Sequence, residues 1–112
     1  MAHDEQLAER IRDLVSHEAG VTEKRMFVGR AFLVDGNMAV AASGQGGLMV
    51  RVDPGESDAL IASSPSATRM VMGGREMSGW LRVQSADVEA GDELERWVRT
   101  GVGYARTLPP KA

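Results

Sequence analysis

The sequence of 112 residues contains no cysteine, only two histidines and few aromatic residues (4%). Without cysteine, neither a disulfide nor a thiolate metal site can form. His3 and His17 form no His-x-x-x-His pattern, and no carboxylate pair stands at catalytic spacing. No apolar run approaches the roughly 20 residues that span a bilayer, and the acidic start lacks the apolar core of a secretory signal. We therefore expect a cytoplasmic protein with no metal, no cofactor and no membrane partner.

Motifs for catalysis and phosphate binding are also missing. The sequence has no Gly-x-Ser-x-Gly turn, and Ser16 precedes His17 on a predicted helix, where adjacent side chains point apart. The glycines of Gly44–Gly47 precede a strand pattern, whereas phosphate loops place them between a strand and a helix, so a hairpin turn is the better interpretation. Because no acid, base or nucleophile converges, we predict a protein that is not an enzyme.

The net charge of the chain argues against a uniformly basic surface that would bind phosphate groups. The formal net charge is −3, and an acidic protein repels nucleic acid over most of its surface. Seven basic residues nevertheless lie in or beside predicted strands: Lys24, Arg25, Arg30, Arg51, Arg69, Arg75 and Arg82. A solvated polar sheet face is the plainer interpretation of these residues, and a nucleic-acid patch is the alternative. We expect no tight direct binding of duplex DNA at physiological salt.

The sequence does contain a clear pattern of short strands. Ala31–Val34 and Met38–Ala42 flank Asp35-Gly36-Asn37, which predicts a hairpin with a tight turn. Leu48–Val52 follows too closely for an intervening helix, so it should pair antiparallel with the second run. Gly29 interrupts the run before the hairpin, and we predict Glu23–Val34 as one long strand that bends at this glycine.

Helical spacing of apolar residues predicts helices over about residues 4–18, 53–63 and 92–107. Asp53 and Asp92 stand where helix caps belong. Trp97 is centred on the apolar stripe of the last helix and should be buried. Gly101 and Gly103 each cost that helix up to about 1 kcal/mol relative to alanine, so a neighbouring element should pack closely against both.

Two further strands, at about residues 68–72 and 79–84, are joined by a hairpin connection over residues 73–78. The complete order is α-β-β-β-α-β-β-α. The sequence thus predicts an α+β fold with a five-stranded antiparallel sheet flanked by helices. It forms a single domain over residues 1–112, with an ordered core of about 4–108.

One connection is a candidate for the functional surface. Gly73–Gly79 has turn residues at both ends and charged residues between them. Its arginine offers a planar fork for a carboxylate or phosphate, and its methionine and the following tryptophan offer adaptable apolar contact. The predicted interaction surface comprises Arg25, Arg30, Arg75, Met77 and Trp80. The alternative is an ordinary hairpin loop with the tryptophan in the core.

Five segments stand in a characteristic order: Arg25-Met26-Phe27-Val28-Gly29, Phe32–Met38, Gly47–Asp53, Gly74–Leu81 and Leu94-x-x-Trp97-Val98. Together they resemble the N-terminal domain of the TfoX/Sxy family, bacterial regulators of competence for DNA uptake. The resemblance implies an α+β fold and a role in transcription of competence genes together with the cyclic-AMP receptor protein. Family members usually carry a second, helical domain, whereas this chain ends at Ala112, so we expect a stand-alone copy of the first domain. The resemblance supplies no catalytic residues.

The sequence therefore predicts a non-enzymatic, cytoplasmic binding module that resembles a regulator domain and acts by contact with another protein. The alternative is a small-ligand or nucleic-acid binding domain that uses an arginine-bearing sheet face, and a homodimer stays open. An exposed apolar patch favours a protein partner, whereas a deep pocket with converging arginine and carboxylate groups favours a small ligand.

Overall fold

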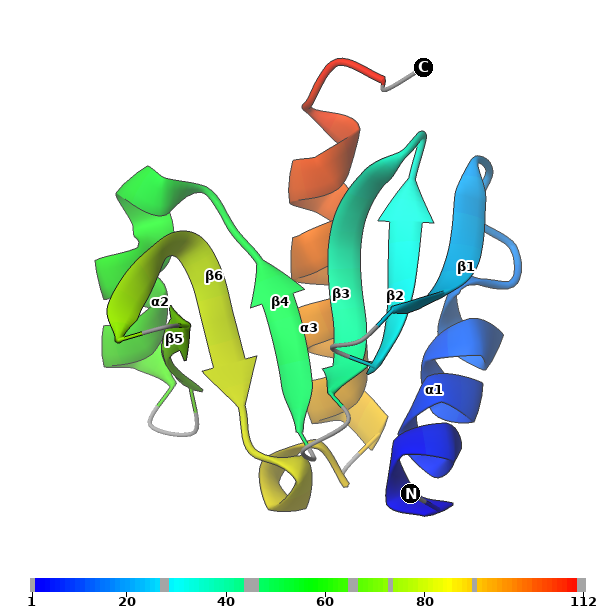
Figure 1. Ribbon diagram of the computed structural model, residues 1–112, viewed down its shortest axis with the longest axis horizontal. Coiled ribbons are helices and arrows are strands. Elements are labelled where there is room, and N and C mark those ends of the chain that lie inside the picture. The colour runs from blue at the N-terminus through cyan, green and yellow to red at the C-terminus, as the bar shows by residue number, and fades with distance from the viewer. Residues whose placement is uncertain are drawn as a thin grey trace.

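The computed structural model describes residues 2–26, 29–43, 47–64, 67–72, 74–89 and 91–110. Within these residues, α-helices, strands and two short 3₁₀ helices follow one another along the chain (Figure 1): α1 (Ala2–Val15), β1 (Val21–Met26), β2 (Gly29–Val34), β3 (Asn37–Ser43), β4 (Leu48–Arg51), η1 (Pro54–Glu56), α2 (Ser57–Ser63), β5 (Ala67–Met72), β6 (Arg75–Val83), η2 (Ser85–Val88) and α3 (Gly91–Arg106). The α+β class with helices flanking a sheet is confirmed.

All strands belong to one sheet in the order β1-β2-β3-β4-β6-β5, and every neighbouring pair is antiparallel. The apolar sides of α1 and α3 pack on the face that carries Phe32, Val40 and Leu81, and α2 adds two side chains from the same side. We call this side the helix face. The opposite side, which carries Ala31 and Met49, is the open face. Figure 1 shows α3 behind β3 and β4, with no helix in front of them.

The prediction of five strands is wrong, because the described residues form six. The long strand predicted over Glu23–Val34 is two strands, β1 and β2, which pair with each other through Arg25 and Arg30 and through Met26 and Gly29. Gly29 has a φ of 132°, a value open to glycine. The chain therefore reverses here, where the sequence predicted a bend. Phe27 and Val28, which stand between β1 and β2 in the sequence, lie outside the described residues.

The hairpin predicted around Asp35-Gly36-Asn37 is confirmed. Asp35 and Gly36 have φ values of 51° and 86°, and two consecutive positive values are what a type I′ turn requires. The pairing of Val34 with Asn37 closes the turn. The antiparallel pairing of β3 with β4 is confirmed as well, although most of the glycine segment between them lies outside the described residues. These two hairpins place β2, β3 and β4 side by side.

The main core fills the space between the helices and the helix face. Trp97 of α3 is 0% exposed, as predicted, and is the largest fully buried side chain. The close approach predicted at Gly101 is confirmed, because a Cβ there would lie 2.5 Å from the carbonyl oxygen of Ala39. The same prediction is wrong for Gly103, where a Cβ would meet nothing within 4 Å. Only one of the two glycines is therefore needed for packing.

One local prediction is wrong. The connection expected over residues 73–78 is mostly strand, since β6 begins at Arg75. Along α3, Arg99 pairs with Glu95 at 2.6 Å and Arg96 pairs with Glu93 at 3.6 Å. Residues four and three positions apart lie next to each other on the surface of a helix.

Candidate interaction surface

The open face can be followed residue by residue from the strand pairing. Residues opposite each other on neighbouring antiparallel strands share a face of the sheet. Starting from β1, one continuous row on the open face runs Lys24, Ala31, Ala41, Met49, Arg82, Thr68. This row crosses every strand and has small residues at β2 and β3, with longer side chains on either side.

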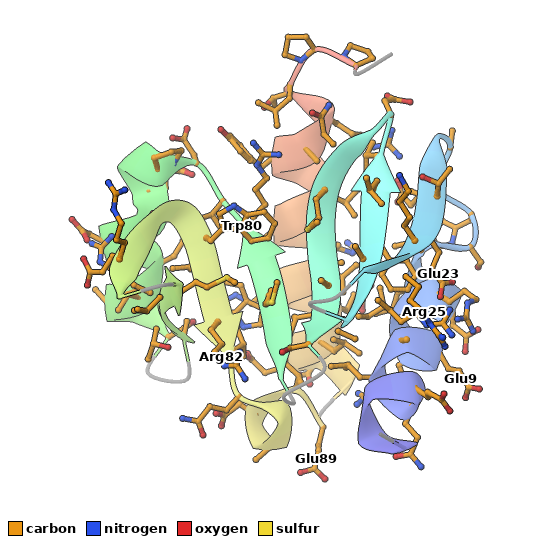
Figure 2. The ribbon with its side chains drawn as sticks, viewed as in Figure 1. Glu9, Glu23, Arg25, Trp80, Arg82 and Glu89 are labelled. Carbon is orange, nitrogen blue, oxygen red and sulfur yellow. The ribbon has the colours of Figure 1, made fainter. Side chains whose placement is uncertain are left out.

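An apolar cluster occupies the centre of the open face. Ala31, Ala41, Met49 and Met70 are buried in it, and Leu33, Met38 and Trp80 pack against it as partly exposed side chains. We call these seven residues the open-face cluster. It contains no residue of α1, α2 or α3, so it is separate from the main core. In Figure 2, Trp80 and Arg82 stand on the face toward the viewer, in front of the sheet.

Cations surround this cluster. Lys24 and Arg82 belong to the row described above, and Arg51 is paired with Trp80 across β4 and β6. The guanidinium carbon of Arg51 lies 5.9 Å from the centroid of the Trp80 ring. A cation over an indole at this distance contributes about 0.5–1 kcal/mol at an exposed site. The contact holds the tryptophan ring against β4.

The acidic residue of strands β1 to β4 lies on the other side of the sheet. Glu23 is paired with Phe32, a helix-face residue. The sequences of β1, β2, β3 and β4 contain no other carboxylate. Within these strands, the open face thus carries cations and no carboxylate.

On the helix face, by contrast, arginines meet carboxylates. Arg12 of α1 donates two hydrogen bonds of 2.7 Å to the carboxylate of Glu23, and Arg30 donates a third of 3.0 Å. The hydrogen bond from Arg12 is the main cause that lowers the pKa of Glu23, with the positive charges of both arginines adding to it. This network ties β1 and β2 to α1 and leaves its charges satisfied.

The structure does not bring the residues of the predicted interaction surface together. Arg25 and Arg30 face each other across β1 and β2 on the helix side, and Figure 2 shows Arg25 beside α1. Trp80 lies on the open face, three strands away from β2 in the sheet. Arg75 is exposed at the start of β6, while the side chain of Met77 lies outside what the structure describes.

Lys24, Arg51 and Arg82 were noted in the sequence as cations in or beside strands, but they were not included in the predicted interaction surface. The alternation of Met49 with Arg51 in β4, and of Trp80 with Arg82 in β6, places each pair on one face. That alternation was visible in the sequence. Which side of the sheet each pair would occupy depends on strand pairing, which the sequence did not reveal.

A hollow lies between the C-terminal end of α1 and α3. It has a volume of about 420 Å³, and its apolar lining includes Leu14, Val98 and Val102. Four charged residues of the lining are matched in two pairs, since Arg106 donates to Glu18 at 2.7 Å and Arg99 pairs with Glu95 at 2.6 Å. His17 lines the same hollow.

Among the residues that the structure describes, no three His, Cys, Asp or Glu side chains gather as metal ligands would. None of the helices in this part of the chain is both long enough and apolar enough to cross a membrane. The candidate site therefore remains the open-face cluster with its surrounding cations.

Comparison with known proteins gives one positive result. A family model described as the TfoX N-terminal domain matches residues 13–105. The match covers most of the chain and confirms the resemblance inferred from the sequence. No significant match was found among curated proteins or among solved structures.

Proposed function

The chain belongs to the TfoX N-terminal domain family, and from this premise we propose that it is a non-enzymatic, cytoplasmic binding module that acts by contact with another protein. Membership suggests a regulator-like domain, and the family is not a known enzyme family. The observation that carries the proposal is the open-face cluster. This is a group of apolar side chains on a face of the sheet that no described helix covers.

The composition of this face supports a protein partner. The solvent-facing side of an antiparallel sheet usually alternates to polar residues. Here the corresponding positions include Leu33, Met38 and Trp80, all partly exposed. Tryptophan, methionine and arginine are enriched at the centres of protein interfaces, and methionine adapts its shape to a partner. The sheet beneath holds these side chains in fixed positions.

The test is affinity capture from the native cell with matched variants as bait. The double variant Met38→Ser with Trp80→Ala removes the exposed part of the cluster. Val71→Ser is the control, because Val71 is 59% exposed, more than any other large apolar side chain that the structure describes, and does not belong to the open-face cluster. We expect the double variant to lose a protein that the wild type and the control both retain. Equal recovery by all three baits, or recovery of no specific protein, would contradict the proposal.

A second candidate function uses the same face. Arg51 stacks on Trp80, and the strand register places Lys24 and Arg82 on the same face of the sheet. This combination of an aromatic ring and cations favours a single-stranded nucleic acid or a small anionic ligand. Its test is fluorescence anisotropy with a labelled oligothymidine of about 20 nucleotides over a salt series. Salt-sensitive binding that Trp80→Ala abolishes would favour this function over protein contact.

A further inference from the structure

Charge is distributed unevenly between the two faces of the sheet. Two helix-face arginines have carboxylates beside them, since Arg30 bonds to Glu23 and Arg69 pairs with Asp58 of α2. The chain as a whole has more acidic than basic residues, 16 against 13. Even so, the one carboxylate of strands β1 to β4, Glu23, lies on the helix face. These four strands therefore place Lys24 and Arg51 on the open face without a strand carboxylate.

Two loop carboxylates next to these strands have neighbours of their own. Asp35, in the turn between β2 and β3, lies close to Gly20. Asp53, after β4, accepts a hydrogen bond of 2.9 Å from the backbone N–H of Gly55. A partner that supplies negative charge would complete this surface.

We propose that the open face binds an acidic, extended segment of the partner protein, with carboxylates opposite Lys24 and Arg51 and an apolar side chain against Trp80. This inference rests on the proposed function and adds the chemistry of the partner. The two cations stand on β1 and β4, three strand spacings apart, or about 15 Å at 4.7–4.9 Å for each spacing. An extended chain rises about 3.3 Å per residue, so the two carboxylates would stand roughly four to five residues apart.

A protein segment fits this face better than a nucleic acid does. Single-stranded nucleic acid binds through several aromatic platforms along a basic groove. Among the described residues of the open-face cluster, Trp80 is the one aromatic side chain, and the others are methionine, leucine and alanine. Apolar anchors among scattered cations match a peptide in which acidic and bulky apolar residues alternate.

The experiment is a selection of random displayed peptides of about 12 residues, long enough to cross the sheet, on the intact chain. Selected peptides are then synthesised, and their Kd is measured by fluorescence anisotropy. We expect a consensus with two acidic residues roughly four to five positions apart and a bulky apolar residue roughly one or two positions beyond one of them, because Trp80 of β6 lies one strand past Arg51 of β4. The open-face variant Lys24→Glu with Arg51→Glu should weaken binding roughly tenfold or more, and the loss should be smaller at high salt.

A matched control carries the same change of net charge. Arg25→Glu with Arg99→Glu reverses two cations outside the open face, on β1 toward α1 and on the exposed side of α3. It should bind the selected peptides with an affinity close to that of the wild type. Melting curves of both double variants show whether each is folded, and Trp80→Ala provides a further variant without charge reversal if one of them is not.

Several outcomes would overturn the inference. These are no enrichment of peptides, a neutral or basic consensus, or peptide binding that the open-face and control variants weaken equally. Binding of oligothymidine that is lost in the open-face variant would assign the face to nucleic acid. A captured protein that depends on Met38 and Trp80 but tolerates Lys24→Glu with Arg51→Glu would retain the proposed function and reject the acidic segment. If affinity capture recovers no specific protein and peptide selection enriches no peptide, both the proposed function and the acidic segment are rejected.

Discussion

The two tryptophans of this chain lie on opposite faces of the same sheet. Each has an arginine over its ring, Arg96 over Trp97 at 5.1 Å and Arg51 over Trp80 at 5.9 Å. Trp97 is fully buried between α3 and the helix face, whereas Trp80 is partly exposed at the rim of the open-face cluster. The same side chain with the same cationic neighbour therefore stabilises the fold at one position and is accessible to a partner at the other.

The difference between the faces extends to their charges. On the helix face, arginines are matched with carboxylates from the same chain, as Arg12 and Arg30 are with Glu23. On the open face, Lys24 and Arg51 share their side with apolar residues, and strands β1 to β4 place no carboxylate there. Paired charges and a large core are features of a surface closed within the fold. Cations around a small, partly exposed apolar cluster are features of a surface that another molecule completes.

Substituting the two tryptophans separately gives the largest expected contrast. Trp97→Ala should lower the free energy of unfolding by about 3–5 kcal/mol, because it leaves a cavity in the main core. Trp80→Ala should cost about 1–2 kcal/mol, because part of that ring is already in water. Urea denaturation of both variants measures the difference. Equal losses, or near-native melting of Trp97→Ala, would show that the faces do not differ in this way.

Much of the fold was predictable because its determinants are local. The Asp35-Gly36 step requires positive φ values, and the apolar stripe of α3 repeats at helical spacing, so neither needs information from distant residues. Gly29 was ambiguous, because a strand bulge and a chain reversal both use glycine with positive φ. Because the chain reverses at Gly29, where a bulge was predicted, one predicted strand becomes two and the sheet has six strands in place of five.

The candidate site was less predictable than the fold. Strand alternation shows that Trp80 and Arg82 share a face, but only the pairing of β6 with β4 shows that Met49 and Arg51 join them. Arg25 was placed in the predicted interaction surface because it is near Gly29 in sequence, and the β1–β2 pairing directs it to the helix side. The composition of a sheet face depends on contacts between distant segments, which residue spacing does not contain.

Alanine substitutions at the two glycines of α3 should differ in their effect on stability, and this difference is intermediate in size among those expected here. Gly101→Ala should cost about 1–3 kcal/mol, because the new Cβ would overlap the backbone of Ala39 and the side chain of Val40. Gly103→Ala should stabilise the protein by up to about 1 kcal/mol, because alanine favours the helix and its Cβ would meet open space. Thermal melting of the pair measures both effects. Destabilisation by both substitutions would mean that α3 packs more tightly near its C-terminal end than described.

The smallest expected effect concerns the charge network of the helix face. Glu23→Gln should lower the free energy of unfolding by about 0.5–1 kcal/mol near pH 7, since Glu23 is partly exposed and holds Arg12 and Arg30. Its pKa in the folded protein is lowered, chiefly by the hydrogen bond from Arg12. The stabilisation is therefore complete above the ordinary glutamate pKa of about 4.3 and is lost as the pH falls through the lowered folded pKa.

Glu76→Gln, on an exposed strand position, is the control and should change stability by less than about 0.5 kcal/mol. Urea midpoints measured from neutral to acidic pH should show the wild type and Glu23→Gln converging at the acidic end. A difference that stays constant with pH would mean that the carboxylate charge of Glu23 does not hold α1 to β1 and β2.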